Sequence, residues 1–397
     1  MKNNILFIHQ GKGFGGASLC LKELIDEVYD NYNINILCIY DGDAAKYFKK
    51  SGFKTDVLNS YFYQKFYTYF YHSEAFEFRL SRPIYILKSI VSYIFNLFIA
   101  PKIVKSYNPS LVHLNSSVLT DWAIVSKKCG YKVVIHIREP IAHGFFGVRK
   151  KIIQIIIKNY TDRIVAISKD NASRLNLMNK TTIIYDPIRN VNITKTPSVD
   201  KNKHYFLYLG GSQAIKGFNT LVESLPYLND DVIIFFAGGM FDCNLPKGFI
   251  SKIKYYFRFI LRPSHRRMLN NISVVNKSNN TIMLGVIENI YNYLAISSAL
   301  LFPSTRSHFA DPVLEAYKIG KPVIVSDVVG MDEIVNRKTG LFFRKNDEKD
   351  LAEQINELAG IDDNLVEEYK KNCTEKFGYI QSKNNRIIDV FNLTINN

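Results

Sequence analysis

Short apolar runs alternate along the chain with segments whose apolar residues recur every three to four positions. The short runs place Val, Ile and Leu on consecutive positions, which is typical of parallel strands that are buried on both faces of a sheet. The longer segments have the spacing of amphipathic helices. In the first half this pattern predicts strands, with helices between most of them, at residues 4–9, 34–39, 54–58, 111–114, 132–137 and 163–167.

The same alternation restarts after a polar stretch at residues 189–203, which we interpret as a linker. The strands that it predicts there are residues 205–209, 232–237, 281–284, 300–303 and 323–326, and a helical tail begins near residue 351. Two repeats of this kind predict an α/β protein with two Rossmann-like, doubly wound domains. Such folds bind ligands at the carboxyl ends of their strands.

Residues 84–100 are the best candidate for a membrane-spanning segment. They are fewer than the roughly 20 apolar residues needed to span a bilayer, and Lys88 interrupts them. The apolar positions have helical spacing, and Ser89, Ser92 and Asn96 break the run. We therefore expect a buried amphipathic helix rather than a membrane element.

Composition narrows the class of protein. A chain of 397 residues is too long for one ordinary hydrophobic core and suits two domains. The five cysteines are scattered, which favours free buried thiols over disulfides or a zinc site. No export signal is recognised at the N-terminus. The net charge of +15 favours an anionic partner, but no nucleic-acid motif accompanies it, and a basic nucleic-acid-binding module remains a rival class.

A glycine cluster at residues 11–16 lies between the first predicted strand and the first helix. Glycines allow the backbone to approach a phosphate or sugar closely, and a helix N-terminus attracts negative charge. Gly11, Gly13 and Gly16 also fit the dinucleotide fingerprint, with Asp41 in the place of the ribose-binding acid. An NAD(P)-dependent oxidoreductase is therefore an alternative. Asp41 and Asp43 have the spacing of a divalent-metal pair, yet a solvated turn is the stronger interpretation.

The second half carries two further signals. Lys216 lies in a glycine-containing loop between the first strand and first helix of that half, where its charge suits a diphosphate. Glu315 lies just after Pro312, in the predicted first turn of a helix at a strand's carboxyl end. A carboxylate there can accept two ribose hydroxyls, although acids are also common near helix N-termini for electrostatic reasons alone.

These pieces, taken in order, resemble the retaining glycosyltransferases of family 4, which have the GT-B fold. The resemblance covers nearly the whole chain, and its most specific part is residues 300–340. It implies two domains facing each other across a cleft: an acceptor-binding domain at residues 1–190, a nucleotide-sugar domain at 200–375, and a C-terminal helix at 376–397 that returns to the first domain. The matching segments are residues 13–17, 111–115, 165–168, 185–188, 209–217, 285–303, 309–324 and 330–343.

The resemblance also implies roles for single positions. Lys216 would bind the donor diphosphate and Glu315 the donor ribose. The loops would supply the remaining donor contacts, with backbone groups from His308 to Ala310 holding hydroxyls of the transferred sugar. The donor-binding set implied in this way is Gly15, Gly16, Gly211, Ser212, Lys216, Ser307, His308, Phe309, Ala310, Val313 and Glu315.

Three positions depart from the family pattern. Gly211 stands where an arginine is common, and Ser307 stands where the first acid of a glutamate pair is common. A histidine that commonly ends the fourth strand of the first domain corresponds here to His136 or Arg138, and the sequence leaves both open. The catalytic candidates are therefore His136, Arg138, Lys216 and Glu315.

The expected reaction is retaining transfer of a hexose from a nucleotide sugar, with uridine as the base implied by the family. The nucleotide sugar is a substrate, so no cofactor and no metal are expected. The expected acceptor is a glycan or a lipid-linked glycan of capsule or O-antigen type, and no nucleic acid is expected to bind. Two basic and aromatic stretches, residues 61–82 and 247–267, suggest peripheral contact with the anionic inner face of the plasma membrane, with the enzyme otherwise cytoplasmic.

Overall fold

The computed structural model describes residues 2–69, 83–141, 145–240, 263–307 and 309–396. The chain divides into two compact units, each with its own core. Unit 1 comprises Met1–Ile188 and Lys383–Asn397, and unit 2 comprises Arg189–Ser382. We describe each unit by itself.

Unit 1 is built on a seven-stranded sheet in which all paired strands are parallel, in the order β3-β2-β1-β4-β5-β6-β7. The order reverses between β1 and β4, as in a doubly wound fold. Consecutive Val, Ile and Leu side chains on the central strands are buried because helices cover both faces. The strands are β1 (Asn4–His9), β2 (Asn33–Cys38), β3 (Thr55–Val57), β4 (Leu111–Leu114), β5 (Lys132–Ile137), β6 (Arg163–Ala166) and β7 (Thr181–Ile183).

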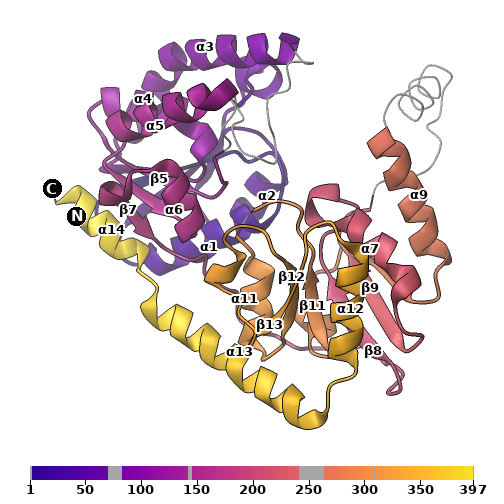
Figure 1. The fold of residues 1–397 in the computed structure, drawn as a ribbon. Helices are drawn as coiled ribbons and strands as arrows, with labels where there is room; N and C mark the ends of the chain where they lie inside the picture. The colour runs from indigo at the N-terminus through magenta and orange to yellow at the C-terminus, as the bar shows by residue number, and fades with distance from the viewer. Residues whose placement is uncertain (1, 70–82, 142–144, 241–262, 308, 397) are drawn as a thin grey trace. The chain divides into compact units, whose positions relative to one another are not determined.

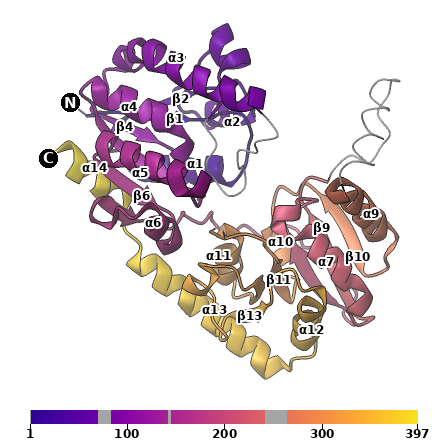
Figure 2. The same ribbon diagram turned by 45° about the horizontal axis from the view of Figure 1, so that its top comes forward.

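Two helical layers enclose this sheet (Figures 1 and 2). One core joins the sheet to helices that include α4, whose Trp122 is fully buried there. The opposite core contains residues of α1, α2 and the C-terminal α14. The helices are α1 (Gly16–Val28), α2 (Asp43–Lys50), α3 (Pro83–Tyr107), α4 (Thr120–Lys128), α5 (Val148–Tyr160), α6 (Lys169–Leu175) and α14 (Ile387–Ile395).

Unit 2 repeats the plan with a six-stranded parallel sheet in the order β10-β9-β8-β11-β12-β13, and its order reverses between β8 and β11. Its strands are β8 (His204–Tyr208), β9 (Val232–Ala237), β10 (Thr281–Gly285), β11 (Ala299–Phe302), β12 (Val323–Ser326) and β13 (Gly340–Phe343). Its helices are α7 (Phe218–Ser224), α9 (Pro263–Lys277), α10 (Tyr291–Leu294), α11 (Asp311–Lys318), α12 (Glu348–Ala359) and α13 (Asp363–Lys383).

The expectation of two Rossmann-like α/β halves is confirmed, and most predicted strands lie within two residues of the observed bounds. Two edge strands, β7 and β13, were not predicted, and both contain residues that are only partly buried. The C-terminal segment differs from the single helix expected at residues 376–397. α13 ends at Lys383, and α14 begins at Ile387 and packs within unit 1.

The prediction for residues 84–100 was correct on the helix and wrong on which face it buries. Ser89, Ser92 and Asn96 are fully buried in α3, whereas Leu87 and Phe98 on its other side are exposed. One described helix, Ile84–Tyr107, has the length and apolar character of a membrane-crossing segment, with 22% of its most apolar window buried.

Candidate functional site

The predicted donor residues of unit 2 gather where its strand order reverses. β8 and β11 are neighbours in the sheet, and the loops after them contain Lys216 and Ser307. The two loops are joined by backbone hydrogen bonding, because the Thr305 amide donates to the Ile215 carbonyl over 3.0 Å. In doubly wound sheets this reversal is where ligands bind.

Close backbone packing explains two glycines of the first loop. Gly217 has a φ of +85°, and a side chain there would overlap the carbonyl oxygen of Pro303. Gly211 has a φ of +54° and lies against the backbone of Gly239, while the Ser212 amide donates to the Gly239 carbonyl over 3.2 Å. An arginine at position 211 would not fit this crossing, which accounts for one departure from the family pattern.

Lys216 is positioned by this loop. Its ammonium lies 5.6 Å from the centre of the Phe302 ring, at the end of β11. Burial lowers the pKa of Lys216 below its usual range, and the Asp311 carboxylate partly opposes that shift. A buried cation at the end of the central strands is suited to an incoming anion.

Glu315 is the fifth residue of α11, so it lies just beyond the first turn in which the sequence placed it. Dipole effects fade after the first turn and do not explain a buried acid at this position. Its carboxylate accepts from Arg189 Nη2 over 3.0 Å, and Lys318 donates to the Arg189 carbonyl over 2.8 Å. Burial raises the pKa of Glu315, while Arg189 opposes the increase.

The remaining donor candidates of unit 2 form the loop that leads into α11. Ser307 is buried and donates to the Val329 carbonyl over 2.6 Å, so in this structure it fixes the loop. Phe309 is half-buried, and Ala310 and Val313 are fully buried at the start of the helix. His308 lies outside the described residues.

The glycine cluster of unit 1 separates into two parts. Gly11 is structural, since a side chain there would overlap the Tyr40 backbone, and Gly42 of the neighbouring loop packs against the backbone of Gly11 and Lys12. Gly15 and Gly16 are exposed, and α1 begins at Gly16 without a side-chain cap. No side chain of the described residues caps the first amides of α1, which suits a helix N-terminus that receives an anionic group.

A chain of buried polar side chains fixes the start of α1. Arg138 donates to both carboxylate oxygens of Asp186 over 2.7 Å and to Asn115 Oδ1 over 2.9 Å. Asn115 Nδ2 lies 3.0 Å from His9 Nδ1, and His9 Nε2 lies 3.1 Å from Ser18 Oγ in the first turn of α1. Burial, and secondarily Arg138, lowers the pKa of His9 to about 3, so its imidazole is neutral in this hydrogen-bond network.

The structure separates the two candidates for the family histidine. His136 lies within β5 and is fully buried, with its ring 5.6 Å from that of His113. Neither ring nitrogen of His136 has a hydrogen-bond partner among the described residues. Arg138 follows the last residue of β5 and belongs to the polar chain at the carboxyl edge of the sheet.

The acids considered for the alternative sites are exposed. Asp41 follows β2, and Asp43 pairs with Lys46 over 3.6 Å in the first turn of α2. Within the described part of each unit taken alone, groups of three or more His, Cys, Asp or Glu side chains with metal-binding spacing are not found.

Sequence reasoning missed four residues of these networks. His9, Asn115 and Asp186 belong to the polar chain of unit 1, and Arg189 belongs to the ion pair with Glu315. Two of them had a readable signal, since His9 is the last residue of β1 and Asn115 directly follows β4. Arg189 was assigned to the linker because the chain around it is polar.

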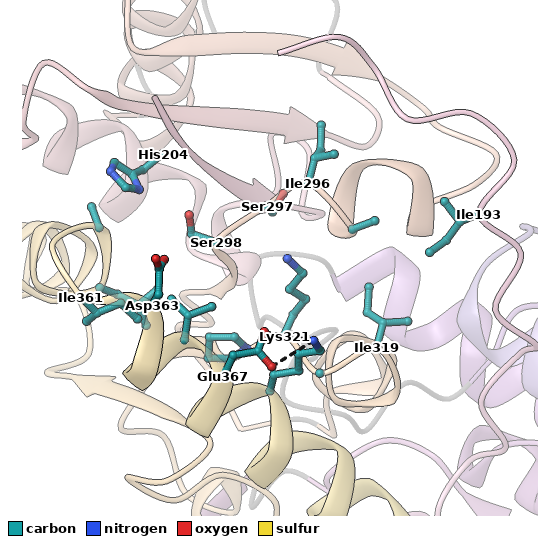
Figure 3. A pocket seen from close by; sticks show the side chains of 17 residues that line it. Ile193, His204, Ile296, Ser297, Ser298, Ile319, Lys321, Ile361, Asp363 and Glu367 are labelled. Atoms are coloured by element: carbon teal, nitrogen blue, oxygen red, sulfur yellow. Dashed lines mark hydrogen bonds and ion pairs between the residues drawn. The ribbon is translucent and has the colours of Figure 1, made fainter. Parts of the chain in front are cut away.

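One cavity of unit 2 lies away from these residues. It measures about 530 Å³ and is lined by Ser298 and Pro322, which directly precede β11 and β12, with Lys321 at its centre (Figure 3). It therefore opens at the amino ends of the strands. None of the predicted donor residues lines it.

Residues 192–376 match the family model described as glycosyl transferases group 1. This range covers most of unit 2 and includes Lys216 and Glu315. Unit 2 is therefore similar to glycosyl transferases group 1 over most of its length.

Two curated relatives and one solved structure extend the comparison. An uncharacterized glycosyltransferase of Methanocaldococcus jannaschii is 24% identical over 227 residues, 55% of this chain and 56% of the relative. The capsular polysaccharide biosynthesis glycosyltransferase CapM of Staphylococcus aureus is 30% identical over 89 residues, 22% of this chain and 23% of CapM. The matches thus span about half and about a quarter of these relatives. Anabaena HepE in complex with UDP is similar in structure, with a TM-score of 0.67, 18% identity and coverage of 99% and 100% of the two chains.

Proposed function

We propose that this protein is a retaining glycosyltransferase that moves a sugar from a uridine-linked donor to a glycan acceptor. The observation that carries the proposal is the strand-order reversal of unit 2, where the Lys216 loop is hydrogen-bonded to the loop leading to Glu315. The group 1 domain match covers the same residues. HepE, which has the same fold, was solved with UDP and with UDP-glucose, which supports uridine as the base.

The donor would bind with its diphosphate at Lys216 and its ribose at Glu315. Lys216 and the amides of its loop would neutralise charge as it develops on the leaving diphosphate, which is electrostatic stabilisation without a metal. The Glu315 carboxylate is held by Arg189 through one oxygen, Oε1, which leaves Oε2 able to accept from ribose hydroxyls. Backbone groups from 308 to 310 would hold hydroxyls of the sugar.

Retention would proceed by same-face displacement assisted by the leaving phosphate. The buried carboxylates at the carboxyl edge of the unit 1 sheet are already engaged. Asp186 pairs with Arg138, and Glu139 accepts from Ser116 over 2.8 Å and from Ser117 over 3.1 Å. Neither is placed as a nucleophile. We assign the orienting role of the family histidine to Arg138, and we assign His136 to the core.

The acceptor would be a lipid-linked glycan of a surface polysaccharide such as capsule or O-antigen, processed at the inner face of the plasma membrane. The short match to CapM supports this class of pathway. The chain's charge of +15 suits both a phosphorylated acceptor and an anionic membrane. Of the two basic and aromatic stretches, residues 70–82 and 247–262 lie outside the described part of the chain.

The deciding experiment is calorimetric titration of UDP into the purified protein in the presence of EDTA. GDP and NAD are titrated separately as the alternative ligands. UDP is expected to bind with EDTA present. Lys216→Ala should weaken that binding by at least about tenfold, because a hydrogen bond to a charged group contributes about 1.5–3 kcal/mol. Transfer activity should fall further, by about 10²–10³, as for other groups that stabilise developing charge.

Lys321→Ala is the matched control. Burial lowers the pKa of Lys321 as it does that of Lys216, but Lys321 lies in the cavity at the opposite edge of the sheet. Its replacement should leave UDP affinity within about twofold, well below the tenfold that about 1.4 kcal/mol produces. Wild-type affinity in Lys216→Ala would remove the donor assignment. Binding of NAD but not of UDP or GDP would return residues 11–16 to the oxidoreductase interpretation.

A further inference from the structure

α3 buries a row of uncharged polar side chains and exposes a row of apolar ones. Ser89, Ser92 and Asn96 are fully buried against unit 1. On the other side Ile84 is 82% exposed and Phe98 is 80% exposed. The outward face consists of Ile84, Leu87, Ile90, Ile94, Phe95 and Phe98, and we call it the α3 apolar face.

Buried hydrogen bonds fix this orientation. Asn96 donates to Asp121 Oδ2 over 2.8 Å and accepts from the Tyr63 hydroxyl over 2.7 Å. Ser92 donates to the Thr68 carbonyl over 2.9 Å. If α3 rotated to bury its apolar side, these groups would lose their partners, which costs more than the bonds contribute while they are made. The hydrogen bonds on the buried side of α3 therefore hold its apolar face outward.

α5 presents a second, smaller apolar row. α4 packs against both α3 and α5, and the three helices lie together on unit 1 in Figure 1. Val148, Ile152 and Ile155 are exposed at helical spacing along α5, and Phe146 just before it is fully exposed. Isolated exposed apolar residues are ordinary, but contiguous rows on one helix mark an interaction surface.

The charge pattern selects the partner. α3 and α5 contain 25 and 13 residues and not one Asp or Glu. Exposed lysines accompany both rows: Lys102 and Lys105 end α3, and Lys151 and Lys158 lie on α5. A second copy of this chain would bring like charges together, whereas an anionic lipid surface complements them.

We propose that α3 is an interfacial membrane helix, whose apolar face inserts among the acyl chains of an anionic bilayer while its lysines contact the headgroups. The helix lies in the membrane plane and does not cross it, because its buried side is hydrogen-bonded to unit 1 at Ser89, Ser92 and Asn96. The proposal deepens the membrane part of the proposed function and rests on it for the acceptor. It places the contact on described residues that the sequence had assigned to the core.

The test is flotation of the full chain with vesicles of phosphatidylcholine alone or with 30% phosphatidylglycerol (about one anionic lipid in three, a composition chosen for the assay). The wild-type protein should float with anionic vesicles, and binding should fall as salt is raised. Leu87→Asp/Phe98→Asp should reduce the bound fraction at least about tenfold, since both side chains are exposed and their insertion is lost. Circular dichroism and thermal unfolding should be unchanged.

Met178→Asp/Leu365→Asp is the control, because it places the same charges at exposed apolar positions outside α3 and α5 and should bind as the wild type. Equal binding by the α3 variant and the wild type, or no wild-type binding to anionic vesicles, would overturn the proposal. A wild-type dimer that the α3 variant converts to a monomer would assign the face to a second copy instead. Flotation uses no sugar donor, so its outcome is separate from that of UDP binding.

Discussion

At the scale of the residue, the buried acid of the donor site is paired with one arginine. Burial raises the pKa of Glu315 and so favours its protonated form. Arg189, which donates to the carboxylate, opposes this shift and favours the charged form. The sequence identified Glu315 from its place after a strand and a proline. It could not identify Arg189, because nothing local to residue 189 shows that residue 315 folds next to it.

Protonation of Glu315 should weaken donor binding at low pH. A carboxylate accepts two ribose hydroxyls and a protonated carboxyl group accepts them less well, so UDP affinity should fall as the pH drops through the pKa of Glu315. Because burial raises that pKa, the fall should begin above the usual range of a glutamate. Titration of UDP from pH 7.5 to 5, into the wild type and Glu315→Gln, measures the effect.

The ratio of the two affinities is the informative quantity, since protonation of UDP itself affects both proteins equally. It should be largest at pH 7.5 and should decrease by up to about tenfold per pH unit once the carboxyl group is protonated. A ratio that does not change with pH would show that Glu315 does not contact the donor.

At the scale of the element, the pattern of apolar residues predicted the strands whose residues are buried on both faces of a sheet. Central strands such as β1, β4 and β5 were placed to the residue, because consecutive apolar residues buried on two faces leave little freedom. The edge strands β7 and β13 were missed although β4 is as short, because their residues are partly exposed and the two-face burial argument does not apply to them. α3 was assigned the wrong buried face because periodicity shows that a helix has two sides and not which side the domain covers.

The loops of the donor site depend on close backbone approach, which makes Gly217 a sensitive position. Alanine there must adopt a left-handed conformation, which costs about 1–2 kcal/mol, and its Cβ would also overlap the Pro303 carbonyl. The overlap should displace the Lys216 loop from the end of β11. Gly217→Ala is therefore expected to lose more than about 2 kcal/mol of unfolding free energy and to weaken UDP binding at least about tenfold.

Gly130 supplies the comparison for that prediction. It has a φ of +88° at the end of α4, but a side chain there would meet open space. Gly130→Ala should therefore show only the conformational cost of about 1–2 kcal/mol in urea unfolding. Its UDP affinity should equal that of the wild type. If both variants bind UDP normally, the packing of Gly217 on Pro303 does not position the donor site.

At the scale of the whole molecule, the two units should respond to different conditions. The described donor residues with buried charge belong to unit 2, whereas the buried imidazoles of His9, His113 and His136 all belong to unit 1. UDP should therefore raise the unfolding temperature of unit 2, because a ligand that binds only the folded state stabilises it by about 2.7 kcal/mol at a hundred times its Kd. Acid should act on unit 1 through the histidines.

The sign of the acid effect follows from the pKa of His113, which burial and the nearby Arg138 lower from 6.5 to about 3. Its neutral form contributes stability that is complete above pH 6.5 and is lost as the pH falls toward 3, at up to about 1.4 kcal/mol per pH unit. His113→Phe removes this loss and no side-chain hydrogen bond, since both ring nitrogens lack a partner among the described residues. Between pH 6 and 5, calorimetry should show unit 1 of the variant gaining about 1.4 kcal/mol relative to the wild type. A difference that stays constant with pH would mean that His113 is reached by water and protonates in the folded domain.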